Sequence, residues 1–425
     1  MKTVNHRTIK FYTLGCKANQ YDTQCIREDF LGSGFKEQDE GKKAEIYVIN
    51  TCTVTHRADS GSLNLVRRAK RENPKAAIVV TGCLAELDRD KIALVDRNIL
   101  IAGNNQKRRI VALFRKYPVS GNGKGISYFK GHTRAFLKIQ DGCNNACSYC
   151  KVPLVRGASV SRPLAEIIDE AKRLAENDYK EIVLTGICLG SWGKDLEPRV
   201  GLTEVIKRLE GVRGIARIRL SSIELQDVSE ELIKHMAASD KLCRHLHIPL
   251  QSGDDSILKK MHRRYTRAEY LAKIKNIKRR IPGIAITTDV LVGFPGESEK
   301  NFLNTAGVIK EIQPLKVHLF PYSKREHTFA ALRFKEGAQP LVMKQRCGFL
   351  RGVSEKCARE FKKRFLDKKT SVLIEGRCRF YAGFWEGHTG NYIKVLLKSR
   401  RDLKDTLVVA RLKKIEADSV VAELC

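Results

Sequence analysis

The first third of the chain alternates short apolar runs with longer amphipathic stretches. The apolar runs, TIKFYTLG (8–15), AEIYVIN (44–50) and AAIVVTG (76–82), are rich in the β-branched and aromatic residues that buried strands favour. The stretches between them, DTQCIREDFLGSG (22–34) and RADSGSLNLVRRAKREN (57–73), have helical apolar spacing. This alternation predicts a parallel sheet with helical crossovers, which is a Rossmann-like α/β domain.

The same alternation resumes after residues 118–126, whose Gly- and Ser-containing composition is typical of a linker. Amphipathic helices are expected at 164–177 and 267–281. Six apolar runs are strand candidates: RAFLKIQ (134–140), EIVLTG (181–186), ARIRLSS (216–222), HLHIPL (245–250), IAITTDVLVGF (284–294) and KVHLFPY (316–322). Six repeated β/α units predict a full or partial barrel.

The pattern changes again towards the C-terminus. Residues 344–369 are predicted to form one basic helix, and the short alternating segments that follow indicate a small antiparallel β-barrel. We therefore expect an α/β multi-domain protein with domains at 1–118, 129–360 and 364–425.

Charge narrows the class of partner. Lys and Arg number 79 against 48 Asp and Glu, so the formal net charge is +31, and such an excess attracts nucleic acid. A basic protein without a specific partner and a protein that touches anionic lipid are the alternatives. The chain starts without the apolar core of a signal peptide, and no stretch approaches the ~20 apolar residues of a membrane span. We expect a cytoplasmic protein that binds nucleic acid and no membrane.

Three cysteines, Cys143, Cys147 and Cys150, lie close together in DGCNNACSYC (141–150). In a reducing compartment such a cluster indicates metal binding or chemistry rather than disulfides. A zinc site would need a fourth ligand, for which His132 is a candidate, but structural zinc sites usually pair two C-x2-C hooks and the sequence has no second hook. Thiolates also bind iron–sulfur clusters. We favour a [4Fe–4S] cluster with one iron left open.

A second set of cysteines follows the ends of the first three predicted strands. Cys16 ends TLGC, Cys52 follows the second strand and Cys83 follows the third. The carboxyl ends of parallel strands share one edge of the sheet, where ligands bind. We expect the three thiols to converge on a second metal centre, although any one of them alone would be interpreted as a small buried apolar residue.

These motifs resemble those of a known family. Cys143-x3-Cys147-x-Tyr149-Cys150 is similar to the signature of radical S-adenosylmethionine enzymes. The segments TLGCKANQYD, INTCTVT and TGCLAE, together with HIPLQSGDDSIL (247–258) and TDVLVGFPGES (288–298), resemble the methylthiotransferases. PYSKREHTFAA (321–331) and GICLGSWG (186–193) resemble the branch that makes 2-methylthio-N6-threonylcarbamoyladenosine in tRNA.

The resemblance implies two [4Fe–4S] clusters and two molecules of S-adenosylmethionine. One S-adenosylmethionine methylates a sulfur held at the second cluster. The other S-adenosylmethionine supplies a 5′-deoxyadenosyl radical that removes hydrogen from C2 of adenine 37, next to the anticodon. An aromatic C–H has no acidic proton, so a radical suits this step better than an acid–base pair. The resemblance assigns no catalytic side chain. It implies tRNA, a flavodoxin- or ferredoxin-like electron donor and a sulfur source as partners, and we expect a monomer.

The resemblance also implies contacts with S-adenosylmethionine. Tyr149 belongs to the cluster signature, and Gly186 would expose backbone to the methionine amino group. Ser222 and Glu224 would meet the ribose or the methionine part. The remaining contacts would be with the adenine, which Gly293 would approach and which Phe320 and Tyr322 would line.

The C-terminal module resembles the TRAM domain, an RNA-binding barrel. Aromatic residues stand near basic ones in it, which suits stacking on bases and attraction to phosphate: Tyr381, Phe384, Trp385 and Tyr392 with Arg377, Arg379, Lys394 and Lys398. About half of these aromatics are expected in the core of the barrel.

Two other functions remain open on the sequence. One is a methylthiotransferase that acts on N6-isopentenyladenosine-37 of tRNA. The other is a non-catalytic, zinc-stabilised RNA-binding protein.

Overall fold

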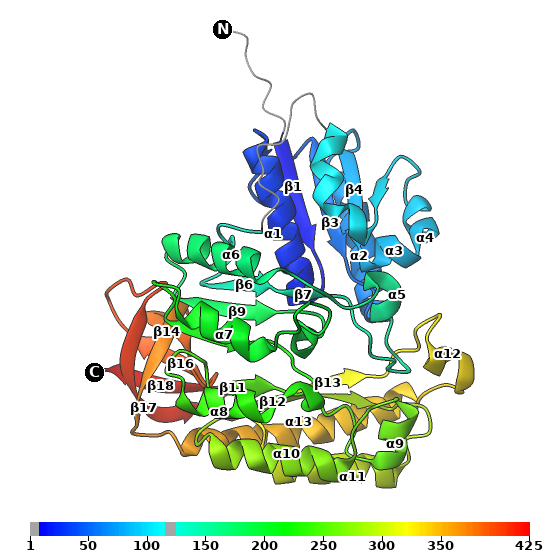
Figure 1. Cartoon of the computed structure of the whole chain (residues 1–425). Helices are drawn as coiled ribbons and strands as arrows, with labels where there is room; N and C mark the ends of the chain where they lie inside the picture. Colours follow the sequence, from blue (N-terminus) through cyan, green and yellow to red (C-terminus); the bar gives the residue numbers. More distant parts are fainter. Residues whose placement is uncertain (1–7, 115–124) are drawn as a thin grey trace. The chain divides into compact units, whose positions relative to one another are not determined.

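The N-terminal apolar runs form a parallel sheet in the computed structural model, which describes residues 8–114 and 125–425 (Figure 1). The strand order is β2-β1-β3-β4-β5, and the five strands are β1 (Thr8–Thr13), β2 (Lys36–Glu37), β3 (Ile46–Thr51), β4 (Ala77–Gly82) and β5 (Leu100–Ala102). Every pairing in the sheet is parallel, so the Rossmann-like prediction is confirmed for this sheet. Residues 118–124 of the expected linker lie outside the described ranges.

Both faces of this sheet are buried. Ile46 and Val48 of β3 pack with Phe30 of α1, whereas Tyr47 and Ile49 pack with Val66 of α2 on the other face, as period-2 alternation requires. The covering elements are α1 (Lys17–Gly32), α2 (His56–Glu72), α3 (Cys83–Leu87), α4 (Arg89–Ala93) and the 3₁₀ helix η1 (Asn104–Phe114). The short elements β2, β5, α3 and α4 were not predicted.

The described residues group into two compact units, which we describe separately. The first comprises residues up to 130 with 141–145 and 150–160, and the second comprises 131–140, 146–149 and 161–425. The division into three domains stays a prediction.

Parallel strands follow one another in chain order in the second unit. One set is β10-β9-β6 and the other is β11-β12-β13, and parallel bridges Ile218↔Leu242 and Ser222↔His247 join β10 to the segment of β11. The strands are β6 (Arg134–Lys138), β9 (Glu181–Thr185), β10 (Arg217–Leu220), β11 (His245–His247), β12 (Ala285–Val292) and β13 (Lys316–Pro321). No pairing joins β6 to β13 in the described ranges, so the barrel is partial.

Helices cover the outer side of this barrel, as Figure 1 shows for α10, α11 and α13 beneath β11, β12 and β13. The expected helices at 164–177 and 267–281 are α6 (Leu164–Glu176) and α10 (Arg267–Arg280). The other elements are β7 (Gln140–Asp141), α5 (Val152–Arg156), β8 (Val160–Ser161), η2 (Leu189–Ser191), α7 (Leu202–Glu210), η3 (Leu225–Asp227), α8 (Glu230–Ala238), α9 (Asp255–Lys260), α11 (Glu299–Ile312) and α12 (Phe329–Arg333).

The predicted basic helix has different ends in the structure. Helix α13 spans Pro340–Lys363 rather than 344–369. Asp367 adopts a φ of +60° and its N–H donates to the carbonyl of Leu412 at 2.7 Å. This bond between segments far apart in the sequence replaces the helical one, so the chain turns before Lys369 and enters a strand.

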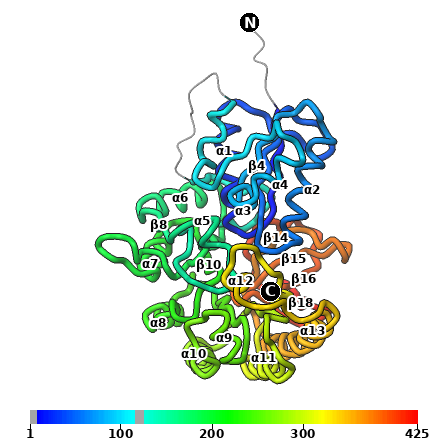
Figure 2. Tube along the Cα trace, turned by 90° about the vertical axis from the view of Figure 1, so that its right-hand side faces the viewer, coloured from blue at the N-terminus to red at the C-terminus, as the bar shows by residue number. Residues whose placement is uncertain are grey.

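The C-terminal strands close into a barrel in the order β14-β15-β16-β18-β17, and they stay grouped in both views (Figures 1 and 2). They are β14 (Lys369–Arg377), β15 (Phe384–Thr389), β16 (Lys394–Lys398), β17 (Leu407–Glu416) and β18 (Ser419–Leu424). The C-terminal barrel packs on β10, because Arg219 donates to the carbonyls of Thr389 and Gly390 at 3.2 and 3.1 Å. No helix in 8–114 or 125–425 combines the length and apolar character needed to cross a bilayer.

Candidate functional site

The three cysteines that follow the N-terminal strands come together in the first unit. Cys16 precedes α1, Cys52 follows β3 and Cys83 begins α3. Burial raises the pKa of Cys52 to about 11, and the neighbouring thiols of Cys83 and Cys16 raise it too. The segments that carry these cysteines therefore lie close together at the carboxyl edge of the sheet. Three thiols are a donor set that suits an iron–sulfur cluster, and their role as ligands stays a prediction.

Glycines allow the strand ends to approach so closely. Gly82 has a φ of +95°, and a Cβ there would lie 2.4 Å from both the Thr51 carbonyl oxygen and Asn50 Oδ1. Gly15 has a φ of +109°, and a Cβ there would lie 2.9 Å from the Cβ of Cys52. A side chain at either position would move a cysteine-bearing segment.

A buried arginine stands beside these thiols. The Arg156 side chain is 2% exposed and lies 2.7 Å from Asp141 Oδ1 and 3.2 Å from Asp22 Oδ2. Burial raises the pKa of Cys83, while the charge and hydrogen bond of Arg156 act in the opposite direction. Lys107 Nζ also lies 2.7 Å from Asp22. Sequence reasoning missed this group, because Asp22 and Arg156 carry no signal that links them.

The DGCNNACSYC loop has backbone donors next to two of its sulfurs. Cys143 Sγ accepts from the N–H of Asn145 at 3.4 Å, and Cys150 Sγ accepts from the N–H of Val152 at 3.4 Å. All three cysteines of the loop are free and partly exposed. Hydrogen bonds to sulfur stabilise thiolate ligands, so the donor set of the loop fits an iron–sulfur cluster.

The second cysteine of this loop, Cys147, contacts an arginine that was not predicted. Arg263 Nη1 donates to Cys147 Sγ at 3.3 Å, and Nη2 forms an ion pair with Glu224. Burial raises the pKa of Cys147, and the positive charge of Arg263 opposes that rise. Arg263 thus links Glu224 to Cys147, and the role of Glu224 toward S-adenosylmethionine stays a prediction.

The other predicted cofactor contacts lie at the carboxyl ends of the barrel strands. Gly186 follows β9, Ser222 lies just beyond β10, Gly293 follows β12 and Phe320 is near the end of β13 with 43% exposure. Tyr149 contacts Phe294, whose ring also meets Tyr322 at 5.3 Å between centroids. Their roles toward S-adenosylmethionine stay predictions.

Two predicted positions have a structural explanation of their own. Gly293 has a φ of +79°, and a Cβ there would lie 2.5 Å from Met343 Cγ, so the backbone conformation and the packing of α13 both favour glycine. His132 packs its ring against Phe136 with centroids 5.6 Å apart.

The aromatics of the C-terminal barrel divide between core and surface. Trp385 is 2% exposed beneath the guanidinium of Arg377, and Tyr392 is stacked on His245 and His388. By contrast, Tyr381 is 43% exposed. The expectation that about half are core residues agrees with this division.

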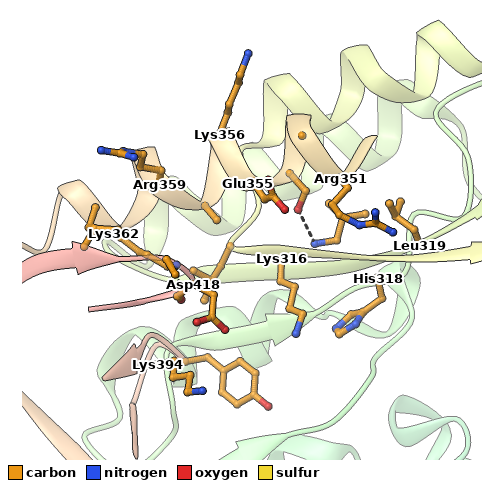
Figure 3. A pocket seen from close by; sticks show the side chains of 18 of the residues that line it. Lys316, His318, Leu319, Arg351, Glu355, Lys356, Arg359, Lys362, Lys394 and Asp418 are labelled. Carbon is orange, nitrogen blue, oxygen red and sulfur yellow. Dashed lines mark hydrogen bonds between the residues drawn. The ribbon is translucent and has the colours of Figure 1, made fainter. Parts of the chain in front are cut away.

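A cavity of about 1120 Å³ lies between β13, α13 and the C-terminal barrel (Figure 3). Its charged lining is mostly basic, with Lys316, Arg351, Lys356, Arg359, Lys362 and Lys394 against Glu355 and Asp418. Arg351, Lys356 and Arg359 are exposed on α13. This excess of positive charge can attract phosphate.

Comparisons with known proteins agree with these features. Residues 137–309 match the family model "Radical SAM superfamily", and residues 8–103 match "Uncharacterized protein family UPF0004". A radical S-adenosylmethionine methyltransferase, TsrM, from Kitasatospora setae has a similar fold, with a TM-score of 0.55 and 14% identity over 77% of each chain.

Curated relatives match nearly the whole chain. Threonylcarbamoyladenosine tRNA methylthiotransferase MtaB from Bacillus subtilis is 37% identical over 96% of this chain and 94% of its own. The protein of that name from Chlamydia pneumoniae is 36% identical over 98% of each chain. A tRNA-2-methylthio-N(6)-dimethylallyladenosine synthase from Clostridium novyi is 36% identical over 88% of this chain and 87% of its own. The chain therefore belongs to the radical S-adenosylmethionine tRNA methylthiotransferases, enzymes that use a [4Fe–4S] cluster and S-adenosylmethionine to transfer a methylthio group.

Proposed function

We propose that this enzyme adds a methylthio group to C2 of N6-threonylcarbamoyladenosine at position 37 of tRNA. In this proposal it uses two [4Fe–4S] clusters and two molecules of S-adenosylmethionine. An external electron donor and a sulfur source complete the reaction. Relatives named for this nucleoside support the choice of substrate, although relatives named for dimethylallyladenosine are similar at comparable identity.

The presence of two separate groups of three cysteines carries the proposal. One group, Cys16, Cys52 and Cys83, comes from three strand ends, and the other, Cys143, Cys147 and Cys150, comes from one loop. Each group offers three thiols where a cluster takes four ligands. An open iron in the loop would bind S-adenosylmethionine, and an open iron at the strand ends would hold sulfur.

The side chains around each group have distinct roles in this proposal. When bound and reduced, the loop cluster and S-adenosylmethionine supply the radical chemistry. Arg263 donates to Cys147 and anchors Glu224, which orients that carboxylate toward the cofactor. Arg156 supplies a buried positive charge next to the strand-end thiols, and this charge favours their thiolate forms.

The basic cavity and the C-terminal barrel would bind the RNA. Phosphates of the anticodon arm would meet Arg351, Lys356 and Arg359, and an unpaired base would stack on exposed Tyr381. These contacts would give affinity for the RNA. The choice of nucleoside would be made by residues of the partial barrel formed by β6 and β9 to β13.

Mass spectrometry of tRNA nucleosides tests the substrate. A strain that lacks this enzyme should lose 2-methylthio-N6-threonylcarbamoyladenosine and accumulate the precursor without sulfur. Loss of 2-methylthio-N6-isopentenyladenosine, with the threonylcarbamoyl product intact, would assign the enzyme to the other substrate.

Iron and sulfide analysis after anaerobic reconstitution tests the clusters. The wild type should hold two clusters, and replacing Cys16, Cys52 and Cys83 together with Ala should halve both iron and sulfide. Replacing Cys143, Cys147 and Cys150 should remove the other half. A wild type with one cluster would contradict the proposal, and a colourless protein that holds zinc would indicate a non-catalytic RNA-binding protein.

A further inference from the structure

The adjacent strands β11, β12 and β13 of the partial barrel carry polar side chains on the face that points away from the covering helices. Thr288 of β12 meets the Tyr270 hydroxyl of α10 at 3.2 Å, so its neighbours Thr287 and Asp289 face the opposite way. Asp289 pairs in register with His318 of β13, which therefore shares its face. A face that would bury apolar residues in an ordinary core is here lined by ionisable groups.

The polar groups on this face touch one another. His247 Nε2 lies 3.1 Å from Asp289 Oδ1, and His247 Nδ1 lies 2.9 Å from Thr287 Oγ1. The rings of His247 and His318 have centroids 5.6 Å apart. One ligand atom from each of His247, Asp289 and His318 lies within 4.8 Å of the other two, and all three residues are partly exposed.

The cluster reaches the basic cavity through His318. His318 and Lys316 line the cavity, and Figure 3 shows both side chains pointing from β13 away from α13. A small group in the cavity would meet the Lys316 ammonium and the His318 imidazole, and the Asp289 carboxylate lies next to that imidazole. A pocket with few convergent polar groups is typical of a ligand site.

We propose that His318, Lys316 and Asp289 bind the threonyl part of the modified adenosine, an inference that rests on the proposed function. That part of the nucleoside carries a carboxylate, a hydroxyl and urea N–H groups. Lys316 and His318 donate to the carboxylate, and Asp289 accepts from the hydroxyl or an N–H. His247 is a positioning residue that holds Asp289.

The same chemistry disfavours an isopentenyl group. An apolar substituent in this place would remove water from a lysine, an imidazole and a carboxylate without replacing their hydrogen bonds. A site built to bind polar groups rejects the analogue that lacks them far more strongly than an apolar pocket rejects a larger group. The cluster thus determines specificity between the two nucleosides.

A divalent metal ion is the other ligand that two imidazoles and a carboxylate suit. However, both ring nitrogens of His247 lie within hydrogen-bonding distance of Asp289 and Thr287. Coordination would require His247 to give up one of these contacts, so the geometry favours an organic ligand with its own donors and acceptors.

Binding of tRNA to the reconstituted enzyme tests the inference, measured by fluorescence anisotropy without reductant. One tRNA is prepared with threonylcarbamoyladenosine, isopentenyladenosine or unmodified adenosine at position 37. The wild type should bind the first at least about tenfold tighter than the other two. His318→Leu and Lys316→Met should each remove most of that preference, and Asp289→Asn should reduce it. Lys356→Met, which alters the helix side of the same cavity, should weaken all three complexes equally.

Three results separate the possible outcomes. An unchanged preference in His318→Leu and in Lys316→Met, with wild-type iron content, would overturn the inference and leave the proposed function standing. Wild-type enzyme that modifies only the isopentenyl tRNA would overturn the proposed function. A metal ion other than cluster iron, bound by the wild type and lost in both His318→Leu and Asp289→Asn, would make the cluster a metal site and also overturn the inference.

Discussion

Arg156 shows how one residue can hold two parts of a site. Its side chain is buried between Asp141 and Asp22 and reaches the Cys83 thiol. Arg156→Met would leave Asp141 without its cation and Asp22 with Lys107 alone, so we expect the free energy of unfolding of the apoprotein to fall by about 3 kcal/mol. Urea denaturation measures this change. Arg68→Met removes a surface ion pair with Glu72 and should cost at most about 0.5 kcal/mol. Equal losses in the two variants would mean that the Arg156 network contributes little.

Gly82 is the second residue on which the strand-end cysteines depend. Gly82→Ala would place a Cβ 2.4 Å from the Thr51 carbonyl oxygen and Asn50 Oδ1 at a positive φ. We expect it to displace Cys83, lower the free energy of unfolding by about 1–3 kcal/mol and halve the iron that the protein retains. In Gly348→Ala, on α13, the new Cβ meets nothing within 4 Å, and this variant should gain about 0.5–1 kcal/mol. Full iron content in Gly82→Ala would show that the backbone there can relax.

Single residues were predictable where topology alone brings them together. Cys16, Cys52 and Cys83 converge because carboxyl ends of parallel strands share an edge. Arg156 and Arg263 were missed, since their contacts with Asp22 and Glu224 join segments 134 and 39 residues apart. Sequence periodicity carries no information on such pairs. By contrast, the alternating polar residues of HLH (245–247) and KVH (316–318) do indicate which face of β11 and β13 lies inside the partial barrel.

At the scale of elements, one partly buried lysine of helix α10 bonds the C-terminal end of α11. Lys278 Nζ donates to the carbonyls of Ile312 and Gln313, and burial, with Arg364 nearby, lowers its pKa from 10.5 to about 8. Between pH 8 and 10.5 the unfolded chain holds a proton that the folded chain has released. The free energy of unfolding should therefore gain a contribution that rises with pH across this window.

Urea denaturation at pH 7 and pH 10 measures that contribution. The Lys278→Met variant should lack this pH-dependent contribution. The free energy of unfolding of the wild type should therefore rise relative to that of the variant between pH 7 and pH 10. Lys275, which pairs with Glu311 at the surface, gives the matched control, because Lys275→Met should follow wild type at both pH values. The same wild-type-to-Lys278→Met difference at the two pH values would refute the lowered pKa.

Long elements were predicted well and their ends less so. The strands β1, β3, β4, β9 and β12 lie within one or two residues of the apolar runs that predicted them, because burial of both faces gives a strong signal. The two-residue strand β2 has too few positions to show a period. The predicted helix continued to Lys369, but α13 ends at Lys363, and beyond it the Asp367 N–H donates to the carbonyl of Leu412.

At the scale of the whole molecule, the net charge of +31 makes affinity for tRNA depend on salt. Each phosphate contact contributes about 0.7–0.9 to the slope of log K against log salt. The exposed residues Arg351, Lys356 and Arg359 line the basic cavity, and no ion pair with another described residue neutralises them. They are the cations best placed to contribute to this slope.

Replacing Arg351, Lys356 and Arg359 together with Gln should make the slope shallower by about 2–3. Binding of tRNA measured between low and moderate salt gives the slope for wild type and variant. A control with Gln at Lys172, Lys207 and Arg208 removes the same charge from helices where each cation already has an acidic partner, and its slope should match wild type. If both triple variants flatten the slope equally, affinity follows net charge and the cavity is not the RNA site. A change confined to the cavity variant, with S-adenosylmethionine cleavage in the absence of tRNA unchanged, would place the phosphates there.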